Sequence, residues 1–206
     1  MNVYNYLFAK FYDPFMKSLE EKELIKRRKK LLNNISGKIL EVGSGTGINF
    51  GFYNPEKVIV YALEPSIEMW NVAEKKFEVN NFPLHIQKLT FGLEEELFKI
   101  IPEESMDFVV CSLVLCTVPE LEKSIQIIKR ALKQNGTLLV LEHICSNDRV
   151  TRSFQNMINP VWKAFAEGCN LNRHTDKIIK ESGFKLIREE YFENYLNFYE
   201  AEFIKN

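Results

Sequence analysis

Three glycines at alternate positions are the residues of this chain whose spacing has the clearest chemical use. The run Lys38–Val42 leads into Gly43, Gly45 and Gly47, and Glu64 stands at the end of the next apolar run. This order predicts a strand, a tight turn in which no Cβ keeps a ligand away, the start of a helix, and a carboxylate that accepts both hydroxyls of a ribose. A site for an adenosine-containing cofactor is therefore expected here.

The spacing of these glycines favours S-adenosylmethionine over NAD or FAD. The dinucleotide fingerprint has its third glycine where this chain has Ile48. A dinucleotide must bring its pyrophosphate to the N–H groups of the helix, whereas S-adenosylmethionine has no pyrophosphate and packs its methionine part against the turn. In this interpretation Glu41 faces the ammonium group of the ligand and Glu64 binds the ribose. The alternative is an ordinary strand-to-helix turn with two acids at the surface.

Size and charge restrict the function further. The chain has 206 residues, of which 46% are hydrophobic and 27% charged, and such values are typical of a globular domain. We expect one domain over residues 1–206. Its 27 basic and 28 acidic residues leave a net charge of -1. This balance gives no sign of a polyanionic partner, so nucleic acid is not expected.

The cysteines and the apolar runs bear on the location of the protein. Cys111, Cys116, Cys145 and Cys169 have none of the spacings of zinc or haem sites. We expect buried, reduced thiols in a cytoplasmic protein, and no metal. The opening residues lack the pattern of a signal peptide and no apolar run reaches about 18 residues, so no transmembrane segment is expected.

Apolar runs alternate with helical stretches along most of the chain, which indicates a parallel sheet wound on both faces. Two closely spaced runs at the end predict an antiparallel hairpin. The expected fold is therefore α/β, a Rossmann-like, doubly wound mixed sheet of seven strands. These strands are expected at 38–42, 57–63, 84–89, 107–115, 137–143, 184–191 and 195–204.

Local signals also predict where two helices begin and end. Ser18 followed by Glu21 has the spacing of a capping box, so a helix is expected to begin there. An apolar stripe over 121–132 predicts a second helix that lies on the sheet. The pair Asn135-Gly136 is expected to end it.

The assembled motifs resemble those of the class I S-adenosylmethionine-dependent methyltransferases, from about Tyr12 to the end of the chain. The motifs are Ile39–Gly47, Leu63–Ser66 with Met69, Asp107–Cys111 and Leu132–Thr137. A narrower likeness is to the methyltransferase-like alkyl-thiol methyltransferases and their bacterial relatives. It lies in Val110–Val118, Glu142-His143, Asn159–Trp162 and Gly168–Arg173. Phospholipid and quinone methyltransferases share a looser version of this second pattern.

The resemblance implies a role for each matching residue at the cofactor. Glu41 and Gly43 would hold the methionine end, and Met69 would pack on the adenine. The family usually has an acid after the third strand for the adenine amino group, where this chain has Leu93. The end of the fourth strand would face the sulfonium or the acceptor. The complete expected set is Tyr12, Glu41, Gly43, Ser44, Gly45, Gly47, Glu64, Pro65, Met69, Gly92, Leu93, Cys111, Ser112 and Leu113.

The methyl acceptor is expected under the stretch 144–174, which interrupts the alternation of strands and helices after the fifth strand. Insertions at this point cover the edge of the sheet where ligands bind. His143 is the first candidate for a base that deprotonates a thiol, and Trp162 and His174 are candidate substrate contacts. The alternatives are a structural histidine, ordinary aromatic packing, and nearby cysteines that act as small buried hydrophobes.

Residues 1–36 combine a dense aromatic stretch with the basic run Lys26–Lys30. The resemblance implies a lid of helices that folds over the cofactor, and a basic run on a helix is most often a solvated face. The alternative is an interfacial helix that reaches anionic lipid, which would give peripheral membrane contact.

These observations favour an S-adenosylmethionine-dependent methyltransferase that acts on a small, apolar acceptor, with a thiol preferred. A phospholipid amine or a quinone is the alternative acceptor. A non-catalytic protein that binds S-adenosylmethionine is the competing hypothesis from another class. The partner expected in each enzymatic case is a small molecule, and nothing in the sequence assigns an oligomeric state.

Overall fold

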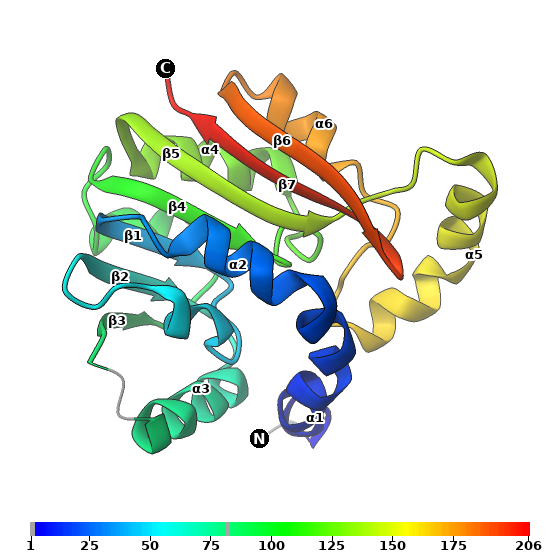
Figure 1. Ribbon diagram of the computed structural model, residues 1–206, viewed down its shortest axis with the longest axis horizontal. Coiled ribbons are helices and arrows are strands. Elements are labelled where there is room, and N and C mark those ends of the chain that lie inside the picture. The colour runs from blue at the N-terminus through cyan, green and yellow to red at the C-terminus, as the bar shows by residue number, and fades with distance from the viewer. Residues whose placement is uncertain (1–2, 81–82) are drawn as a thin grey trace. The chain divides into compact units, whose positions relative to one another are not determined.

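Seven strands form one mixed sheet in the computed structural model, which describes residues 3–80 and 83–206 (Figure 1). Their order is β3-β2-β1-β4-β5-β7-β6. β1, β2 and β3 are parallel, as are β4 and β5, whereas β7 runs antiparallel to β5 and β6. The strands are β1 Gly37–Val42, β2 Val58–Leu63, β3 His85–Leu89, β4 Met106–Ser112, β5 Leu132–His143, β6 Lys185–Asn194 and β7 Leu196–Ile204. The expected Rossmann-like sheet with a C-terminal hairpin is confirmed.

α-Helices connect β2 to β3, β4 to β5 and β5 to β6, as the alternating pattern predicted. A short 3-10 turn takes the place of the expected helical stretch between β1 and β2 and between β3 and β4. The α-helices are α1 Val3–Leu19, α2 Ile25–Leu32, α3 Ile67–Asn80, α4 Leu121–Ala131, α5 Arg149–Phe165 and α6 Thr175–Glu181. Short 3-10 turns lie at Ile48–Phe52 and Glu95–Lys99. Within residues 3–80 and 83–206, every helix is too short or too polar to cross a membrane.

Contacts divide the chain into two compact units, Met1–Leu93 and Glu94–Asn206. The first unit holds β1, β2 and β3. Ile39 of β1 pairs in register with Val60 of β2, and both side chains are fully buried. A parallel strand that is covered on both faces has a nearly continuous apolar sequence. This is why β1 and β2 could be located from the sequence to within one residue.

The helix start that was expected at Ser18 is wrong. α1 continues through Ser18 into a π-helical turn, Glu20–Leu24, and then into α2, so helical backbone extends from Val3 to Leu32 (Figure 1). Ser18 is exposed within α1. A capping box satisfies N–H groups that have no partner at a helix start, and here the preceding helical turns already supply those partners.

In the second unit, α4 lies against β4 and β5 through its apolar stripe. The helix ends at Ala131, before the expected Asn135-Gly136, because Leu132 already pairs with Met106 of β4. Asn135 and Gly136 instead form an irregular part of β5, where Asn135 has a φ of 62°. A Cβ on Gly136 would lie 2.9 Å from a backbone oxygen, so a larger residue would not fit there.

β4 ends at Ser112, three residues before the end expected from the apolar run. The next residue, Leu113, has a φ of 56°. Few residues other than glycine adopt this left-handed conformation, which takes the chain out of the strand. The turn that follows leads to Cys116.

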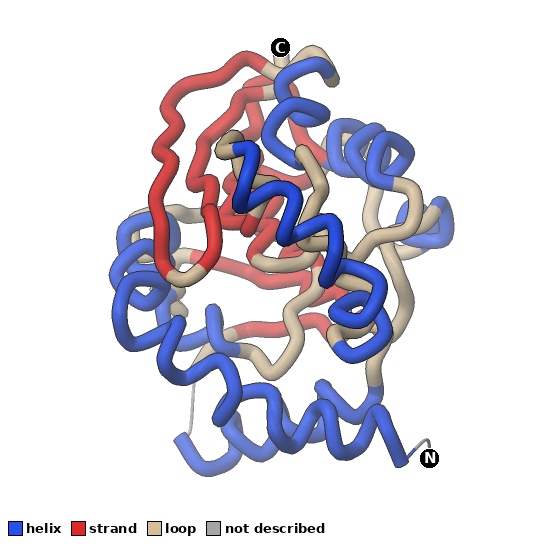
Figure 2. The backbone as a smooth tube through the Cα atoms, turned by 90° about the vertical axis from the view of Figure 1, so that its right-hand side faces the viewer, coloured by secondary structure: helices blue, strands red, loops and turns tan. Residues whose placement is uncertain are grey.

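α5 occupies most of the long stretch that follows β5, and loops join it to β5 and α6 at its two ends (Figure 2). Asp148 caps its first turn, because the Asp148 carboxylate accepts a hydrogen bond from the Thr151 N–H at 2.8 Å. Trp162 and Phe165 both lie on α5. Trp162 is half-buried and Phe165 is exposed.

Candidate functional site

The glycine turn after β1 adopts the conformation that its sequence predicts. Gly43, Gly45 and Gly47 have φ values of 63°, 55° and 73°, and only glycine adopts such values readily. A Cβ on Gly47 would lie 2.5 Å from the ring of Phe50. Within the part of the chain that the structure describes, a Cβ on Gly45 would meet only the Gly43 carbonyl oxygen, at 4.0 Å. Gly47 is thus required for packing, whereas Gly45 leaves one side of the turn open to a ligand.

Glu64, at the end of β2, is held against this turn. Its Oε2 accepts a hydrogen bond from the Gly45 N–H at 2.9 Å, and its Oε1 accepts one from the Ser66 N–H at 2.8 Å. The Trp70 indole N–H donates to the Glu64 carbonyl oxygen at 3.0 Å. These bonds fix the orientation of the carboxylate, which is the requirement for a group that accepts both ribose hydroxyls.

The remaining residues of the turn fit a polar ligand. Ser44 is buried, and its hydroxyl has no hydrogen-bond partner among residues 3–80 and 83–206. A buried hydroxyl without a partner is costly unless a ligand supplies one. Met69 is buried on the first turn of α3 and Pro65 is exposed. Together with the open side of Gly45, this arrangement suits S-adenosylmethionine.

Glu41, which was expected to face the ammonium group, lies in a buried polar network. Its carboxylate accepts hydrogen bonds from the Tyr53 hydroxyl at 2.6 Å and from the Asn49 side-chain amide at 3.1 Å. Burial raises the pKa of Glu41 from 4.5 to about 7, although these hydrogen bonds and the charge of Arg28 oppose the shift. A cation bound nearby would favour the charged form of this carboxylate.

The basic run Lys26–Lys30 is only partly the solvated face that was expected. Arg28 is 3% exposed and forms two hydrogen bonds with the carboxylate of Glu20, at 2.8 and 3.0 Å. It also donates to the side-chain oxygen of Asn49 at 2.6 Å. Arg28 is not solvated as expected, because the buried carboxylate of Glu20 provides a partner for its guanidinium group.

The N-terminal helix is attached to the glycine turn through Asp13, a residue that no motif in the sequence indicated. The Thr46 hydroxyl donates to the Asp13 carboxylate at 2.7 Å. Lys76 of α3 pairs with the same carboxylate and donates to the Thr46 carbonyl oxygen at 3.1 Å. Tyr12, the predicted cofactor contact, is half-buried beside Phe8, with ring centroids 5.6 Å apart. Tyr12 directly precedes Asp13, the residue that is joined to the turn.

The other predicted residues lie at strand ends. Gly92 and Leu93 are half-buried after β3 in the first unit. In the second unit, Cys111 is buried within β4, Ser112 ends that strand, and Leu113 begins the turn with its left-handed φ. This turn is stabilised by an acid on the neighbouring strand.

That acid is Glu142 on β5, which is fully buried. Its Oε1 accepts hydrogen bonds from the Val114 and Leu115 N–H groups, both at 2.8 Å. Burial raises the pKa of Glu142 to about 7. Its Oε2 has no hydrogen-bond partner within the described part of the chain. The carboxylate therefore fixes the turn that carries Cys116.

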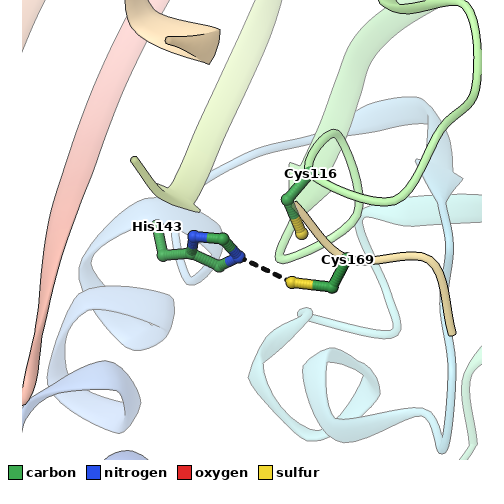
Figure 3. Close-up of side chains that lie close together, drawn as sticks. All are labelled: Cys116, His143 and Cys169. Carbon is green, nitrogen blue, oxygen red and sulfur yellow. Dashed lines mark hydrogen bonds between the residues drawn. The ribbon is translucent and has the colours of Figure 1, made fainter. Parts of the chain in front are cut away.

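His143, the predicted base, meets two cysteines from distant parts of the second unit (Figure 3). Its Nε2 lies 2.9 Å from the Cys169 sulfur, and the Cys116 sulfur lies within 4.8 Å of that sulfur and of a ring nitrogen of His143. The Trp162 indole N–H donates to the Cys169 sulfur at 3.2 Å. His174, the other histidine candidate, is half-buried directly before α6. The structure thus brings His143 and Trp162 together on Cys169, which the spacing of the cysteines did not predict.

The side chains of this cluster shift one another's pKa values. A hydrogen bond with Cys116 lowers the pKa of the Cys169 thiol, and His143 and Trp162 act in the same direction against the effect of burial. Burial alone would lower the pKa of His143, but the contact with Cys169 outweighs it and raises the pKa. Cys169 is therefore the thiol of the cluster that ionises first.

Comparison with known proteins gives a consistent result. Residues 16–189 match the family described as "Methyltransferase domain". Thiol S-methyltransferase TMT1B of Rattus norvegicus is 33% identical over 194 residues, which are 90% of this chain and 77% of that protein. Thiol S-methyltransferase TMT1A of Homo sapiens is 29% identical over 176 residues, which are 81% and 70% of the two chains.

Solved structures agree on the fold. The crystal structure of a SAM-dependent methyltransferase from Aquifex aeolicus is similar to this chain with a TM-score of 0.65 and 19% sequence identity. The similarity covers 96% of this chain and 97% of that one. The shared architecture extends over both units described above.

Proposed function

Because the chain belongs to the class I S-adenosylmethionine-dependent methyltransferases, we propose that it transfers a methyl group to the sulfur of a small, apolar thiol. The observation that carries this proposal is the similarity to a thiol S-methyltransferase over most of both chains. The family and its cofactor leave the acceptor open, because acceptors change readily on this fold.

The first unit supplies the residues that would hold the cofactor. Glu64 would accept the ribose hydroxyls, since two backbone N–H groups already orient its carboxylate. Glu41 would face the ammonium group, and the open side of Gly45 would admit the methionine part. When bound, S-adenosylmethionine supplies a methyl group on a positively charged sulfur, so that the leaving group needs no activation by the protein.

The main task of the protein is then to align the acceptor with that methyl group. Fixed alignment of two reactants lowers a barrier by up to about 7 to 11 kcal/mol. A few per cent of an ordinary cysteine-like thiol is thiolate at neutral pH, and the thiolate is the nucleophile. Binding in an apolar site would select acceptors with small alkyl or aryl groups.

The N-terminal helix would act as the lid over this site. The hydrogen bond between Thr46 and Asp13 joins the helix to the glycine turn, and the ion pair between Asp13 and Lys76 joins it to α3. A ligand in the turn would therefore lie close to a helix that is already attached to it.

The acceptor can be identified by product analysis. The purified chain is incubated with S-adenosylmethionine and a panel of small thiols, amines, phenols, quinols and phospholipids, and S-adenosylhomocysteine and methylated products are measured by mass spectrometry. We expect methylated thiols to dominate. Turnover of a phospholipid amine or a quinol alone would refute the thiol proposal, and cofactor binding without any product would support the non-catalytic hypothesis.

A cofactor-site variant provides the control for this assay. Glu64→Gln removes the charge but keeps the shape of the side chain, and we expect it to weaken cofactor binding by about 1 to 3 kcal/mol because the ribose loses a charged acceptor. Calorimetry measures this loss directly. Unchanged affinity would show that Glu64 does not bind the ribose.

A further inference from the structure

Three side chains with ligand atoms for a soft metal ion meet inside the second unit (Figure 3). Cys116, His143 and Cys169 are all buried, and one ligand atom from each lies within 4.8 Å of the others. In a tetrahedral zinc site with bonds of about 2.0 to 2.3 Å, neighbouring ligand atoms are about 3.5 to 3.8 Å apart. Small side-chain shifts would therefore bring these atoms to coordinating distances.

The backbone segments that carry the two cysteines are joined independently of their sulfurs. The Cys116 carbonyl oxygen accepts hydrogen bonds from the Asn170 N–H at 3.0 Å and from the Asn170 side-chain amide at 2.9 Å. Arg173 donates to the Leu115 and Val118 carbonyl oxygens at 2.6 and 2.7 Å. The framework thus fixes where both thiols lie, which is how proteins preorganise metal ligands.

The turn before Cys169 adopts an unusual backbone conformation. Glu167 and Gly168 have φ values of 50° and 82° in succession, directly before the cysteine. Such conformations persist where the surrounding structure imposes them, and they gather at functional sites. Here the turn directs the Cys169 side chain toward His143.

The surroundings of the Cys169 sulfur also resemble those of a metal ligand. The Trp162 indole N–H donates to this sulfur at 3.2 Å. Hydrogen bonds from outside the coordination sphere orient ligating groups and stabilise their charged form. A structural thiol that only fills space has no need of such a donor.

We propose that Cys116, His143 and Cys169 bind one Zn²⁺ ion. Two sulfur ligands and one imidazole match the preference of this ion. Two thiolates would also balance its charge, so that the buried site is neutral overall. Three protein ligands leave one coordination position for a ligand from outside the cluster, as in catalytic rather than structural zinc sites.

Metal analysis of the 206-residue chain tests this proposal. The protein is purified with its thiols reduced and without chelators, equilibrated with zinc chloride, dialysed, and analysed by mass spectrometry of the elements. We expect one zinc ion per chain. X-ray absorption should show two sulfur atoms at about 2.3 Å and one nitrogen at about 2.0 to 2.1 Å. Failure to retain zinc, or a zinc ion without sulfur neighbours, would overturn the proposal.

Cysteine variants assign the ligands. Cys116→Ser and Cys169→Ser should lose stoichiometric zinc, whereas Cys145→Ser should keep it, because Cys145 is a buried cysteine of the same unit that lies outside the cluster. Equal zinc retention in all three variants would contradict the assignment. If the cluster variants do not fold, the wild-type protein is loaded with cobalt in place of zinc. Sulfur ligands give cobalt a charge-transfer band that oxygen ligands do not, so this band would show that the cysteines bind the metal, and its absence would contradict the assignment.

These measurements are independent of the acceptor. Metal content and spectra report on the cluster whether or not a thiol is methylated. A protein that binds zinc but methylates another acceptor would refute only the proposed function, and a thiol methyltransferase that retains no zinc would refute only the metal site.

Discussion

The glycine turn of the first unit and the cysteine-histidine cluster of the second unit are built in opposite ways. The turn consists of consecutive residues, 43–47, and its main partner is the acid that ends the next strand. The cluster joins Cys116, His143 and Cys169, which come from a turn after β4, the end of β5 and a loop after α5. A contiguous site depends on local backbone conformation, whereas a dispersed site depends on tertiary hydrogen bonds. Substitutions should therefore affect the two regions differently.

The largest effect is expected at Gly47. Gly47→Ala forces a left-handed conformation on alanine and drives its Cβ into the Phe50 ring. We expect a loss of about 2 to 5 kcal/mol in the free energy of unfolding, from about 1 to 2 for the conformation and about 1 to 3 for overpacking. Denaturant unfolding of wild type and Gly47→Ala measures this loss of stability.

Gly45→Ala is the matched control, because its Cβ meets no side chain of the described residues. It should cost only about 1 to 2 kcal/mol in stability but weaken cofactor binding more than that loss explains. Equal destabilisation by the two variants would show that packing does not distinguish the two glycines.

The second effect is a pH dependence that arises in the Glu41 network. The pKa of Glu41 is raised from 4.5 to about 7 in the folded chain, so the folded state binds this proton more tightly than the unfolded state. Its contribution to stability is fully present below pH 4.5 and is lost as the pH rises through 7. The total is about 3 kcal/mol.

Unfolding of wild type and Glu41→Gln at several pH values tests this expectation. The glutamine variant keeps the hydrogen-bonding shape but has no proton to lose, so it should gain stability relative to wild type as the pH rises. Glu56→Gln, at an exposed position, serves as the control. Parallel curves for wild type and Glu41→Gln would contradict the expected shift.

A smaller effect is expected in the cluster region. Asn170→Ala removes the side-chain hydrogen bonds to the Cys116 and Gly168 carbonyl oxygens, both at 2.9 Å. The loss should be about 1 to 2 kcal/mol, and the buried cysteines should react faster with a thiol reagent. Asn172→Ala, which breaks an exposed bond with Asn156, should change stability by less than about 0.5 kcal/mol. Similar values for both variants would show that Asn170 does not hold the cluster together.

The smallest effect concerns the corrected helix boundary. Ser18→Ala should change stability by less than about 0.5 kcal/mol, because Ser18 is exposed inside α1 and caps nothing. Asp148→Ala should cost about 1 kcal/mol, because Asp148 caps α5. Thermal unfolding of both variants checks this contrast. A cost of about 1 kcal/mol for Ser18→Ala would show that Ser18 does act as a helix cap.

The strands and helices that the sequence predicted correctly are those whose residue pattern lies within a few consecutive positions. The buried strands were found because Ile39 and its neighbours form continuous apolar runs. Boundaries failed where a distant contact decided them. Leu132 leaves the helix because it pairs with Met106, and Ser18 does not start one because earlier turns continue through it.

The sequence by itself determined the order of strands and helices, the glycine turn and the acid that ends β2. These features follow from backbone conformations and apolar periodicity, which depend on residues that are adjacent along the chain. The tertiary structure alone decided that Arg28 donates to Asn49 and that His143 meets Cys116 and Cys169. Such contacts depend on distances in space between residues far apart in sequence, and no spacing along the chain specifies those distances.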